Sequence, residues 1–505
     1  MNKNFNWRRL ICMLGFLIII EGLLMLVAAS VDFFYAEKNI FTSGFDFNLL
    51  LQINKNNGFV ALIESGAITI FFGVIFYLIG FRSSKQLGLR EGYSIVSLVW
   101  IFFSIFGMLP FLFSGAVDNV TDAFFESMSG FTTTGSSFFV NVECFPHSLL
   151  LWRSLTEWLG GMGIVVLSLA ILPFLGVSMQ LFTAESTGVT YDKLAPRIKD
   201  TARRLWGMYA VLTLILAALL YFEGMGIFDA VNHALTTIAS GGYSTKDASL
   251  AHWNSQLIHY TIILFMFLTG INYTLMYFAL VQHKFSKLFK DEEFKTFFWV
   301  IIVFTIIILV VNSLTIREIH SIYDFEQNFR ESLFQTVSVL STTGFYVSDY
   351  KIWSPFVLIL LVLLMCSGAC AGSTTGGMKM IRVVIMFKNC RYELRRLLHP
   401  NAILPIRINN KTLQNSVTAN VYAFMTLFVV LFIAGFLALL MAQMPVKEAF
   451  ITSISCISNS CSTIIGGTYS TAAPAAKWIM SALMLVGRLE IFTVVLLFSK
   501  ELWKK

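Results

Sequence analysis

Long runs of apolar residues recur along the whole chain, and short polar stretches separate them. A run of about 20 apolar residues is typical of a helix that crosses a membrane. The pattern predicts two helices at Leu10–Ala29 and Phe59–Phe81. Eight more are expected at Tyr93–Phe113, Leu149–Leu172, Leu205–Phe222, Ser255–Val281, Thr296–Asn312, Pro355–Phe387, Ser416–Ala442 and Ala475–Phe498.

From Tyr93 onward the chain repeats one arrangement four times: an apolar helix, a short amphipathic segment and a second apolar helix. Each short segment opens with an acidic residue, which complements a helix N-terminus. These residues are Asp122, Asp229, Glu331 and Glu448. Thirteen residues after each of them stand Gly135, Gly242, Gly344 and Cys461. Because the offset is identical in all four segments, it indicates an internal repeat rather than four unrelated loops.

The repeat predicts the fold class and the domain organisation. We expect an all-α polytopic membrane protein, in which two accessory helices precede four pseudo-fourfold helix–pore loop–helix repeats around one central pore. The accessory pair is expected in residues 1–90, and the four pore repeats in residues 91–176, 177–290, 291–415 and 416–505.

Composition and charge agree with a membrane protein. The 505 residues are 56% hydrophobic and 13% charged, whereas soluble domains carry about 25% charged residues. Of the 36 Lys and Arg residues, 26 fall in segments that the ten spans place on one side and 8 on the other. This positive-inside bias places both termini in the cytoplasm, and it explains the net charge of +7 without a nucleic-acid partner. The seven cysteines show no spacing typical of a metal site.

The residues at the common offset suit a cation. The four sequences are Thr132–Gly135, Ala239–Gly242, Ser341–Gly344 and Ser458–Cys461. Backbone carbonyls and hydroxyls can replace the hydration shell of a cation without a full negative charge that would trap it. Irregular polar backbone survives at membrane depth only where it is buried in protein or lines a watery path. The segments therefore predict a four-part selectivity filter.

Two further features point to control of the pore. Ser367–Gly377 interrupts the second helix of the third repeat with glycines and hydroxyl residues, and Lys379 follows. It lacks the Gly-Lys-Ser/Thr run and the preceding strand of a phosphate-binding loop, so we expect a plug beneath the filter; a simple helix kink is the alternative. Arg488 lies in the middle of a span, where a charge is costly. It is expected under the filter, or else paired with Glu490 or Glu157.

Two groups of charges have plainer interpretations. Arg153 and Glu157 are four residues apart on a helix and are expected to form a local pair. The basic segment Lys379–Lys411 is either a positive-inside flank or a docking surface for an acidic cytosolic partner.

Several motifs together resemble the membrane subunits of the Trk/Ktr potassium uptake family, of the TrkH type. They are Glu126–Gly135, Trp158–Gly163, Ile171–Gly176, Asp192–Arg197, Ala371–Lys379 and Gly487–Phe492. The resemblance implies potassium uptake, with potassium bound in the filter, by a homodimer with one pore per protomer. It also implies a cytosolic TrkA-type nucleotide-binding regulatory subunit, a multi-pass location among the lipids of the cytoplasmic (inner) membrane of a prokaryote, and no enzymatic activity.

The family's functional positions map onto this chain by motif. The potassium-binding filter positions are Thr133, Thr134, Gly135, Ser240, Gly241, Gly242, Thr342, Thr343, Gly344, Asn459, Ser460 and Cys461. The gating positions are Gly368, Gly372, Ser373, Gly376, Gly377, Lys379 and Arg488.

The fourth filter segment departs from the family pattern. The chain reads Asn459-Ser460-Cys461-Ser462 where similar proteins carry a glycine-containing run, and Gly466-Gly467 comes five residues too late. A cysteine in a left-handed backbone conformation would be strained, so we expect a distorted fourth quarter. Three alternatives remain: a sodium-permeable or ion-coupled symporter of the same fold, a sensory subunit that transports nothing, and a polytopic membrane enzyme.

Overall fold

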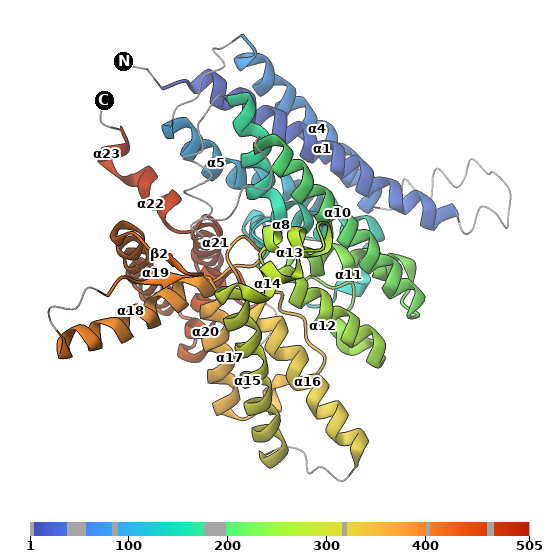
Figure 1. Ribbon diagram of the computed structural model, residues 1–505. Coiled ribbons are helices and arrows are strands. Elements are labelled where there is room, and N and C mark those ends of the chain that lie inside the picture. The colour runs from blue at the N-terminus through green and yellow to red at the C-terminus, as the bar shows by residue number, and fades with distance from the viewer. Residues whose placement is uncertain are drawn as a thin grey trace.

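The computed structural model is mostly helical (Figure 1). It describes residues 5–37, 57–82, 89–175, 198–315, 321–399, 404–461 and 469–503. Four short stretches discussed above lie outside the described residues: Gly176, Asp192–Arg197, Ser462 and Gly466–Gly467.

The first two helices form the expected accessory pair. α1 (Trp7–Glu37) and α4 (Asn57–Gly80) lie side by side in Figure 1. Their glycines allow close approach: a side chain on Gly22 would meet the Gly66 carbonyl oxygen at 3.0 Å, and one on Gly73 would meet the Gly15 carbonyl oxygen at 3.0 Å. Within a membrane the hydrophobic effect does not drive helices together, so they associate through close van der Waals packing. Small residues at the contact allow that packing.

The remaining elements follow the predicted fourfold order. The first group is α5 (Leu89–Gly107), α6 (Leu109–Phe113), α7 (Val120–Phe131), η1 (Val142–Cys144) and α8 (His147–Leu175). The second is α10 (Ile198–Phe222), α11 (Ile227–Ala239), η2 (Ser249–His252), α12 (Gln256–Gly270) and α13 (Tyr273–Leu280), followed by α14 (Phe285–Lys290). The third is α15 (Glu292–Thr315), α16 (Ile322–Leu340), η3 (Tyr350–Ile352), α17 (Pro355–Ser367) and α18 (Met380–Leu398), followed by strands β1 (Arg407–Ile408) and β2 (Lys411–Thr412). The fourth is α19 (Asn415–Met441), α20 (Val446–Ser458), α21 (Pro474–Arg488), α22 (Phe492–Phe498) and α23 (Lys500–Trp503).

The four short helices α7, α11, α16 and α20 close into a ring through their neighbours. Each packs on the two long helices of its own group and on the second long helix of the preceding group: α11 on α8, α16 on α12 and α20 on α17. α21, from the fourth group, packs on α7 from the first. The groups therefore surround one axis, as the internal repeat predicted.

The long helices have the length and composition of membrane spans. Six described spans qualify singly: α1, α4, α5 with α6, α10, α15 and α19. Two bent pairs, α12 with α13 and α21 with α22, raise the number to as many as eight. The 29-residue α8 and the shorter apolar α17 occupy the two remaining expected positions. The structure thus confirms an all-α polytopic membrane protein.

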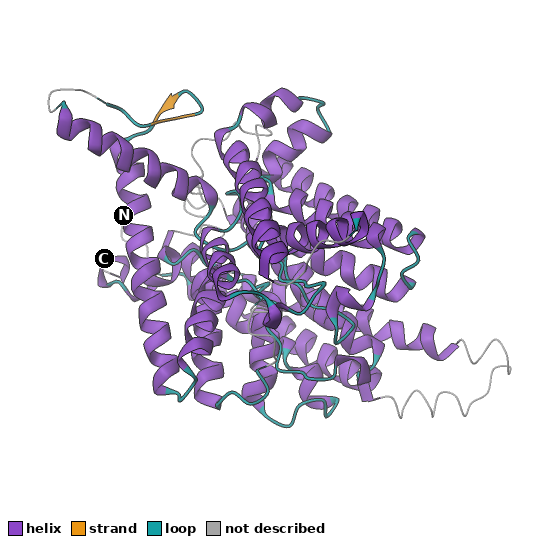
Figure 2. Cartoon of the chain, turned by 90° about the horizontal axis from the view of Figure 1, so that it is seen from below, coloured by secondary structure: helices purple, strands orange, loops and turns teal. Residues whose placement is uncertain are grey.

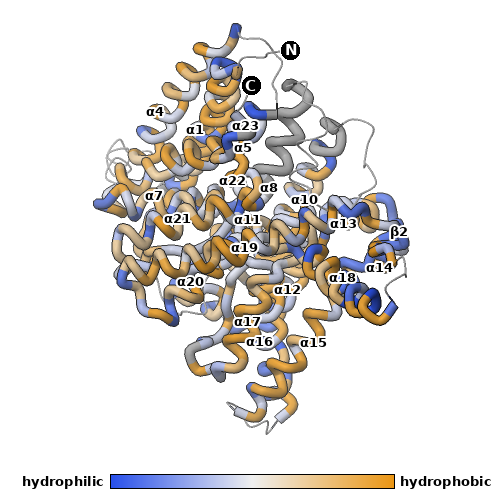
Figure 3. Tube along the Cα trace, turned by 90° about the vertical axis from the view of Figure 1, so that its left-hand side faces the viewer, coloured by the Kyte–Doolittle hydropathy of each residue, from blue (hydrophilic) through white to orange (hydrophobic). Residues whose placement is uncertain are grey.

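Hydropathy along the chain agrees with this assignment. Figure 3 shows hydrophobic residues along most of the long helices and hydrophilic residues gathered around α14, β2 and α18. α15 and α19 expose many large apolar side chains, such as Trp299 and Val430. A helix that is apolar all round is suited to a lipid-facing position. In Figure 2 the β1–β2 hairpin, coloured orange, stands at one edge of the molecule.

Three of the four second helices are broken, whereas the sequence predicted a break only in the third repeat. α12 and α13 meet at 113°, α21 and α22 meet at 110°, and residues 368–379 separate α17 from α18. The break after α12 is stabilised by Asn272, whose side chain accepts the N–H groups of Thr274 and Leu275 and so caps α13. Such backbone at membrane depth must be buried in protein or face water.

The third short helix begins earlier than predicted. α16 starts at Ile322, so Glu331 lies in its interior and does not open it. Ser321 and Asp324 form a capping box at its N-terminus, which satisfies the first backbone donors there. In the other three short helices the expected acidic residue, Asp122, Asp229 or Glu448, does lie in the first turn.

Candidate functional site

All four short helices end in the same way. A residue with left-handed backbone angles comes just after each helix: φ is 52° at Thr133, 58° at Ser240, 56° at Thr342 and 48° at Asn459. The following N–H donates to the carbonyl five residues earlier, at 2.9–3.0 Å, in the pairs Thr134–Ser129, Gly241–Thr236, Thr343–Ser338 and Ser460–Ser455. This is the hydrogen bond of a Schellman motif. Threonine rarely adopts a positive φ, so the surrounding contacts must hold it there.

The segments that follow these helices touch one another in a closed ring. A side chain on Gly135 would overlap the Gly241 carbonyl oxygen, and one on Gly242 would overlap the Thr343 carbonyl oxygen. Gly344 lies against the Cβ of Cys461 in the same manner. The ring closes because the Cys461 thiol donates to the Gly135 carbonyl at 3.2 Å. Gly135, Gly242 and Gly344 have φ values of 71°, 93° and 85°, which only glycine adopts easily.

A cavity opens above this ring. It has a volume of about 600 Å³, and the residues that line it include Gly135, Gly242, Gly344 and Cys461. One residue of each segment therefore faces the same space. In the orientation that the positive-inside bias predicts, this cavity would face the outside of the cell.

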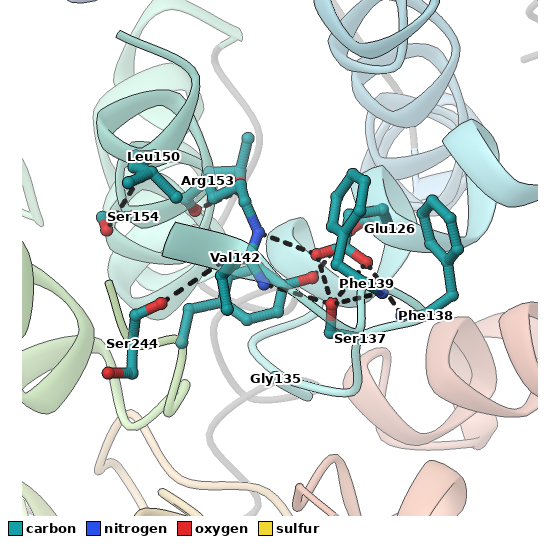
Figure 4. A network of polar contacts seen from close by, with 12 residues as sticks. Glu126, Gly135, Ser137, Phe138, Phe139, Val142, Leu150, Arg153, Ser154 and Ser244 are labelled. Carbon is teal, nitrogen blue, oxygen red and sulfur yellow. Dashed lines mark hydrogen bonds and ion pairs between the residues drawn. The ribbon is translucent and has the colours of Figure 1, made fainter. Parts of the chain in front are cut away.

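A buried ion pair supports the first segment from behind (Figure 4). Arg153 on α8 donates to Glu126 on α7 at 2.8 Å, and both side chains are almost wholly buried. Arg153 also donates to the Ser137 hydroxyl at 3.2 Å and to the Ser244 carbonyl at 3.4 Å. Arg153 thereby links the residues that follow the first segment to those that follow the second segment. The predicted local pair of Arg153 with Glu157 is wrong: the partner is Glu126, 27 residues away in the sequence.

Glu157 has a different place, between the first and second segments. Its two carboxylate oxygens accept the Tyr243 N–H at 3.2 Å, and the side chain is fully buried. A side chain on Gly241 would overlap the Glu157 carboxyl group. This contact explains why the second segment carries glycine where the first and third carry Thr134 and Thr343.

The interrupted helix of the third group lies on the other side of the ring. The Thr374 hydroxyl bonds to the Ser240 hydroxyl at 2.8 Å, and the Gly376 N–H donates to the Thr342 hydroxyl at 2.9 Å. A side chain on Gly376 would also overlap the Ser458 carbonyl oxygen. The ring residues in these contacts come two to three positions before the residues that line the cavity. Residues 368–379 therefore lie on the side of the ring opposite the cavity, beneath the ring.

This loop is fastened from several elements. The Tyr273 N–H, at the break after α12, donates to the Gly372 carbonyl at 3.0 Å. Glu293 on α15 accepts the N–H groups of Ala371 at 2.7 Å and Ile381 at 3.1 Å. Gly368, Gly372 and Gly377 all have positive φ. A further set of bonds stays within the loop, from the Ser373 hydroxyl to the Cys370 carbonyl at 2.5 Å and from Lys379 to the Thr375 hydroxyl at 3.4 Å.

Arg488 ends α21 directly beside the loop. Its guanidinium donates to the Thr374 carbonyl at 2.9 Å and to the Gly160 and Gly161 carbonyls of α8 at 2.5 and 3.0 Å. Gly160 in turn lies against the Phe131 carbonyl, where α7 ends. Arg488 therefore joins the loop to the helix that supports the first segment.

Sequence reasoning missed the residues that hold the ring and the loop in place. Glu126 and Glu293 are buried acidic residues, and Asn272 is a buried amide at a helix break. The signal was present for Glu126, since a carboxylate within an apolar segment requires a partner. For Asn272 and Glu293, only the arrangement of the helices shows that they meet the loop.

Comparison with known proteins places the chain among cation transporters. The TrkH family model, described as a cation transport protein, matches residues 60–505. The Trk system potassium uptake protein TrkH of Salmonella typhimurium is 37% identical over 463 residues, which cover 90% of this chain and 95% of that protein. The protein TrkG of Escherichia coli is 31% identical and spans 97% of this chain and 98% of that protein.

A solved structure agrees with the fold. The crystal structure of the potassium transporter TrkH from Vibrio parahaemolyticus superposes with a TM-score of 0.86 at 31% sequence identity. The match covers 99% of this chain and 100% of the other.

Proposed function

Since the chain belongs to the TrkH family of cation transport proteins, we propose that it takes up potassium across the cytoplasmic membrane through a channel-like pore. The curated relatives are named potassium uptake proteins, and the chain is expected to act as a transporter rather than an enzyme. The observation that carries the proposal is the closed ring of four equivalent segments beneath a cavity that one residue of each segment reaches.

The chemistry of the ring suits a desolvated monovalent cation. Carbonyl and hydroxyl oxygens are dense in the four segments, which we propose bind potassium at the twelve filter positions named above. The negative dipole ends of α7, α11, α16 and α20 meet at the ring and favour a cation there. The buried carboxylate of Glu126 is paired with Arg153, so it does not add a full charge that would hold the ion too firmly.

We further propose that residues 368–379 form the gate. The loop lies directly beneath the ring, and its contacts with Ser240 and Thr342 involve the left-handed residues themselves. A displacement of the loop would remove these contacts and open a path from the ring toward the cytoplasm. Arg488 holds the closed position through its bond to the Thr374 carbonyl, and its positive charge opposes cation flux.

The assembly and orientation are also part of the proposal. We expect a homodimer, cytoplasmic termini, and a cytosolic nucleotide-binding regulatory subunit that moves the gate. α18 continues directly from the gate, and its far end exposes Arg391 and Arg395. It therefore offers a basic surface through which an acidic partner could move the gate. The proposed units are the accessory pair 1–90 and the pore repeats 91–176, 177–290, 291–415 and 416–505.

Ion flux in cells that lack other potassium uptake systems tests the proposal. We expect cells that express this chain with its regulatory subunit to accumulate rubidium faster than sodium, because the ring replaces the hydration shell of the larger ion. Sodium uptake that exceeds rubidium uptake would overturn the potassium assignment and favour the symporter alternative. Reconstituted vesicles that conduct neither ion, with or without the partner, would indicate a sensory subunit.

A further inference from the structure

The fourth segment of the ring departs from the second and third at one peptide group. In those two, the carbonyl oxygens of Gly241 and Thr343 lie against the glycine of the preceding segment, where a side chain would begin. The equivalent oxygen in the fourth segment belongs to Ser460. It accepts a hydrogen bond from the Ser455 hydroxyl of α20 at 2.5 Å. The Ser460 carbonyl is thus turned back toward its own helix.

Cys461 takes the place that this carbonyl leaves. Its Cβ lies against Gly344, and its thiol donates to the Gly135 carbonyl at 3.2 Å. Gly135, Gly242 and Gly344 are among the described residues with positive φ, and Cys461 is not. The strain expected for a left-handed cysteine is therefore avoided, because the backbone adopts another conformation.

These contacts change the outer edge of the ring. Two carbonyl groups are engaged in hydrogen bonds: Ser460 with Ser455, and Gly135 with Cys461. A carbonyl that already accepts a hydrogen bond has less lone-pair density to offer a cation. The number and field strength of the coordinating carbonyls set the choice between potassium and sodium.

We propose that Cys461 is a specificity-determining residue, whose thiol and backbone withhold two carbonyl groups from the outer cation site and so lower the preference for potassium over sodium. This inference rests on the proposed function of the ring as a selectivity filter. It also accounts for a polar, half-buried side chain in the floor of the outer cavity, where the other three segments carry only glycine.

Variants at Cys461 test the proposal through the ratio of rubidium to sodium uptake. Cys461→Gly removes the thiol and permits the backbone conformation of the other segments, so the ratio should rise about three- to tenfold, the factor that one hydrogen bond is worth. Cys461→Ser keeps a donor for the Gly135 carbonyl and should leave the ratio near that of the wild type. Ser455→Ala frees the Ser460 carbonyl alone and should give a smaller rise.

The outcomes separate this inference from the proposed function. If the wild type takes up rubidium but Cys461→Gly has the same ratio, the role of Cys461 is overturned while the filter stands. If the wild type takes up neither ion, the proposed function itself fails. Cys144→Ala serves as the matched control, because Cys144 is an exposed thiol in the loop between α7 and α8 and lies outside the ring.

Labelling the thiol provides a second measurement that needs no altered ring. A small cationic methanethiosulfonate reagent is added outside cells that carry the Cys144→Ala chain. The Cys461 thiolate attacks the reagent sulfur, a mixed disulfide forms and methanesulfinate leaves. Because this replaces the S–H donor and adds bulk at the outer mouth, uptake should fall, and external rubidium should slow the labelling. If the chain labelled at Cys461 keeps both the uptake rate and the rubidium-to-sodium ratio of the unlabelled chain, the proposal is overturned.

Discussion

The buried ion pair behind the first segment gives the sharpest stability prediction. Arg153 and Glu126 lie 2.8 Å apart, and their side chains are 4% and 0% exposed. If Glu126→Gln removes the negative charge, the guanidinium loses its ion-pair partner and stays buried, hydrogen-bonded to the Ser137 hydroxyl and the Ser244 carbonyl. Loss of one partner of a buried ion pair costs about 3–5 kcal/mol. Arg153→Met should lower the free energy of unfolding by slightly less, because Glu126 keeps hydrogen bonds from the Ser137 hydroxyl and the Phe138 N–H.

The effect can be measured as the thermal unfolding midpoint of the purified chain at a fixed ratio of detergent to lipid, together with rubidium uptake. Arg396→Met is the matched control. It breaks the pair with Glu393, whose side chains are 40% and 51% exposed, and such pairs contribute about 0–1 kcal/mol. Both buried variants should unfold well below this control. Arg153→Met should also lose ion selectivity, because its side chain no longer bonds to Ser137 and Ser244 after the first and second segments.

A double variant tests the physical reason for the loss. Glu126→Gln combined with Arg153→Met leaves neither member of the pair charged, so it should be less destabilised than the sum of the single variants by about 2 kcal/mol. The reasoning is refuted if the two single variants unfold together with Arg396→Met. It is also refuted if their effects simply add.

Three further changes have expected outcomes. Gly344→Ser should lower the rubidium-to-sodium uptake ratio, because it places a side chain at φ 85° against Cys461. The control Gly224→Ser, at φ 100° in open space, should leave the ratio unchanged. Equal ratios in the two variants would contradict the assignment of the ring. Deletion of Gly372–Gly377 should raise cation leak into vesicles, and a leak equal to that of the wild type would mean that the loop is only a kink. Glu21 is fully buried in α1, and its carboxylate has no hydrogen-bond partner among the described residues. Glu21→Met should therefore raise the thermal unfolding midpoint, because an apolar side chain needs no hydrogen-bond partner. A lower midpoint would show that Glu21 is paired.

The sequence predicted the long helices, because a run of apolar residues is a local property that the membrane interior selects directly. It also predicted the equivalence of the four segments. The common offset that placed Gly135, Gly242 and Gly344 together corresponds to identical helix ends, at which Thr133, Ser240, Thr342 and Asn459 are all left-handed. Helix ends are set by hydrogen bonds over about five residues, so a repeated sequence yields a repeated geometry.

Helix boundaries were less determined by local sequence. The third short helix begins at Ile322 because Ser321 and Asp324 cap it, although Glu331 resembled the start seen in the other repeats. The break between α12 and α13 has no proline; Asn272 stabilises it by capping α13 and by bonding to the Ala371 carbonyl of the loop. The second of these contacts exists only in the folded chain.

What the sequence alone determined is the membrane class, the fourfold repeat and the positions of the four ring segments. The tertiary structure decided which charges meet: Arg153 pairs with Glu126 across 27 residues of sequence and not with Glu157 on its own helix. It also decided the conformation at Cys461, where contacts with Gly135 and Gly344 replace the expected left-handed strain. Helical periodicity and capping act over a few residues, whereas these choices depend on which helices are neighbours and on how closely their backbones approach.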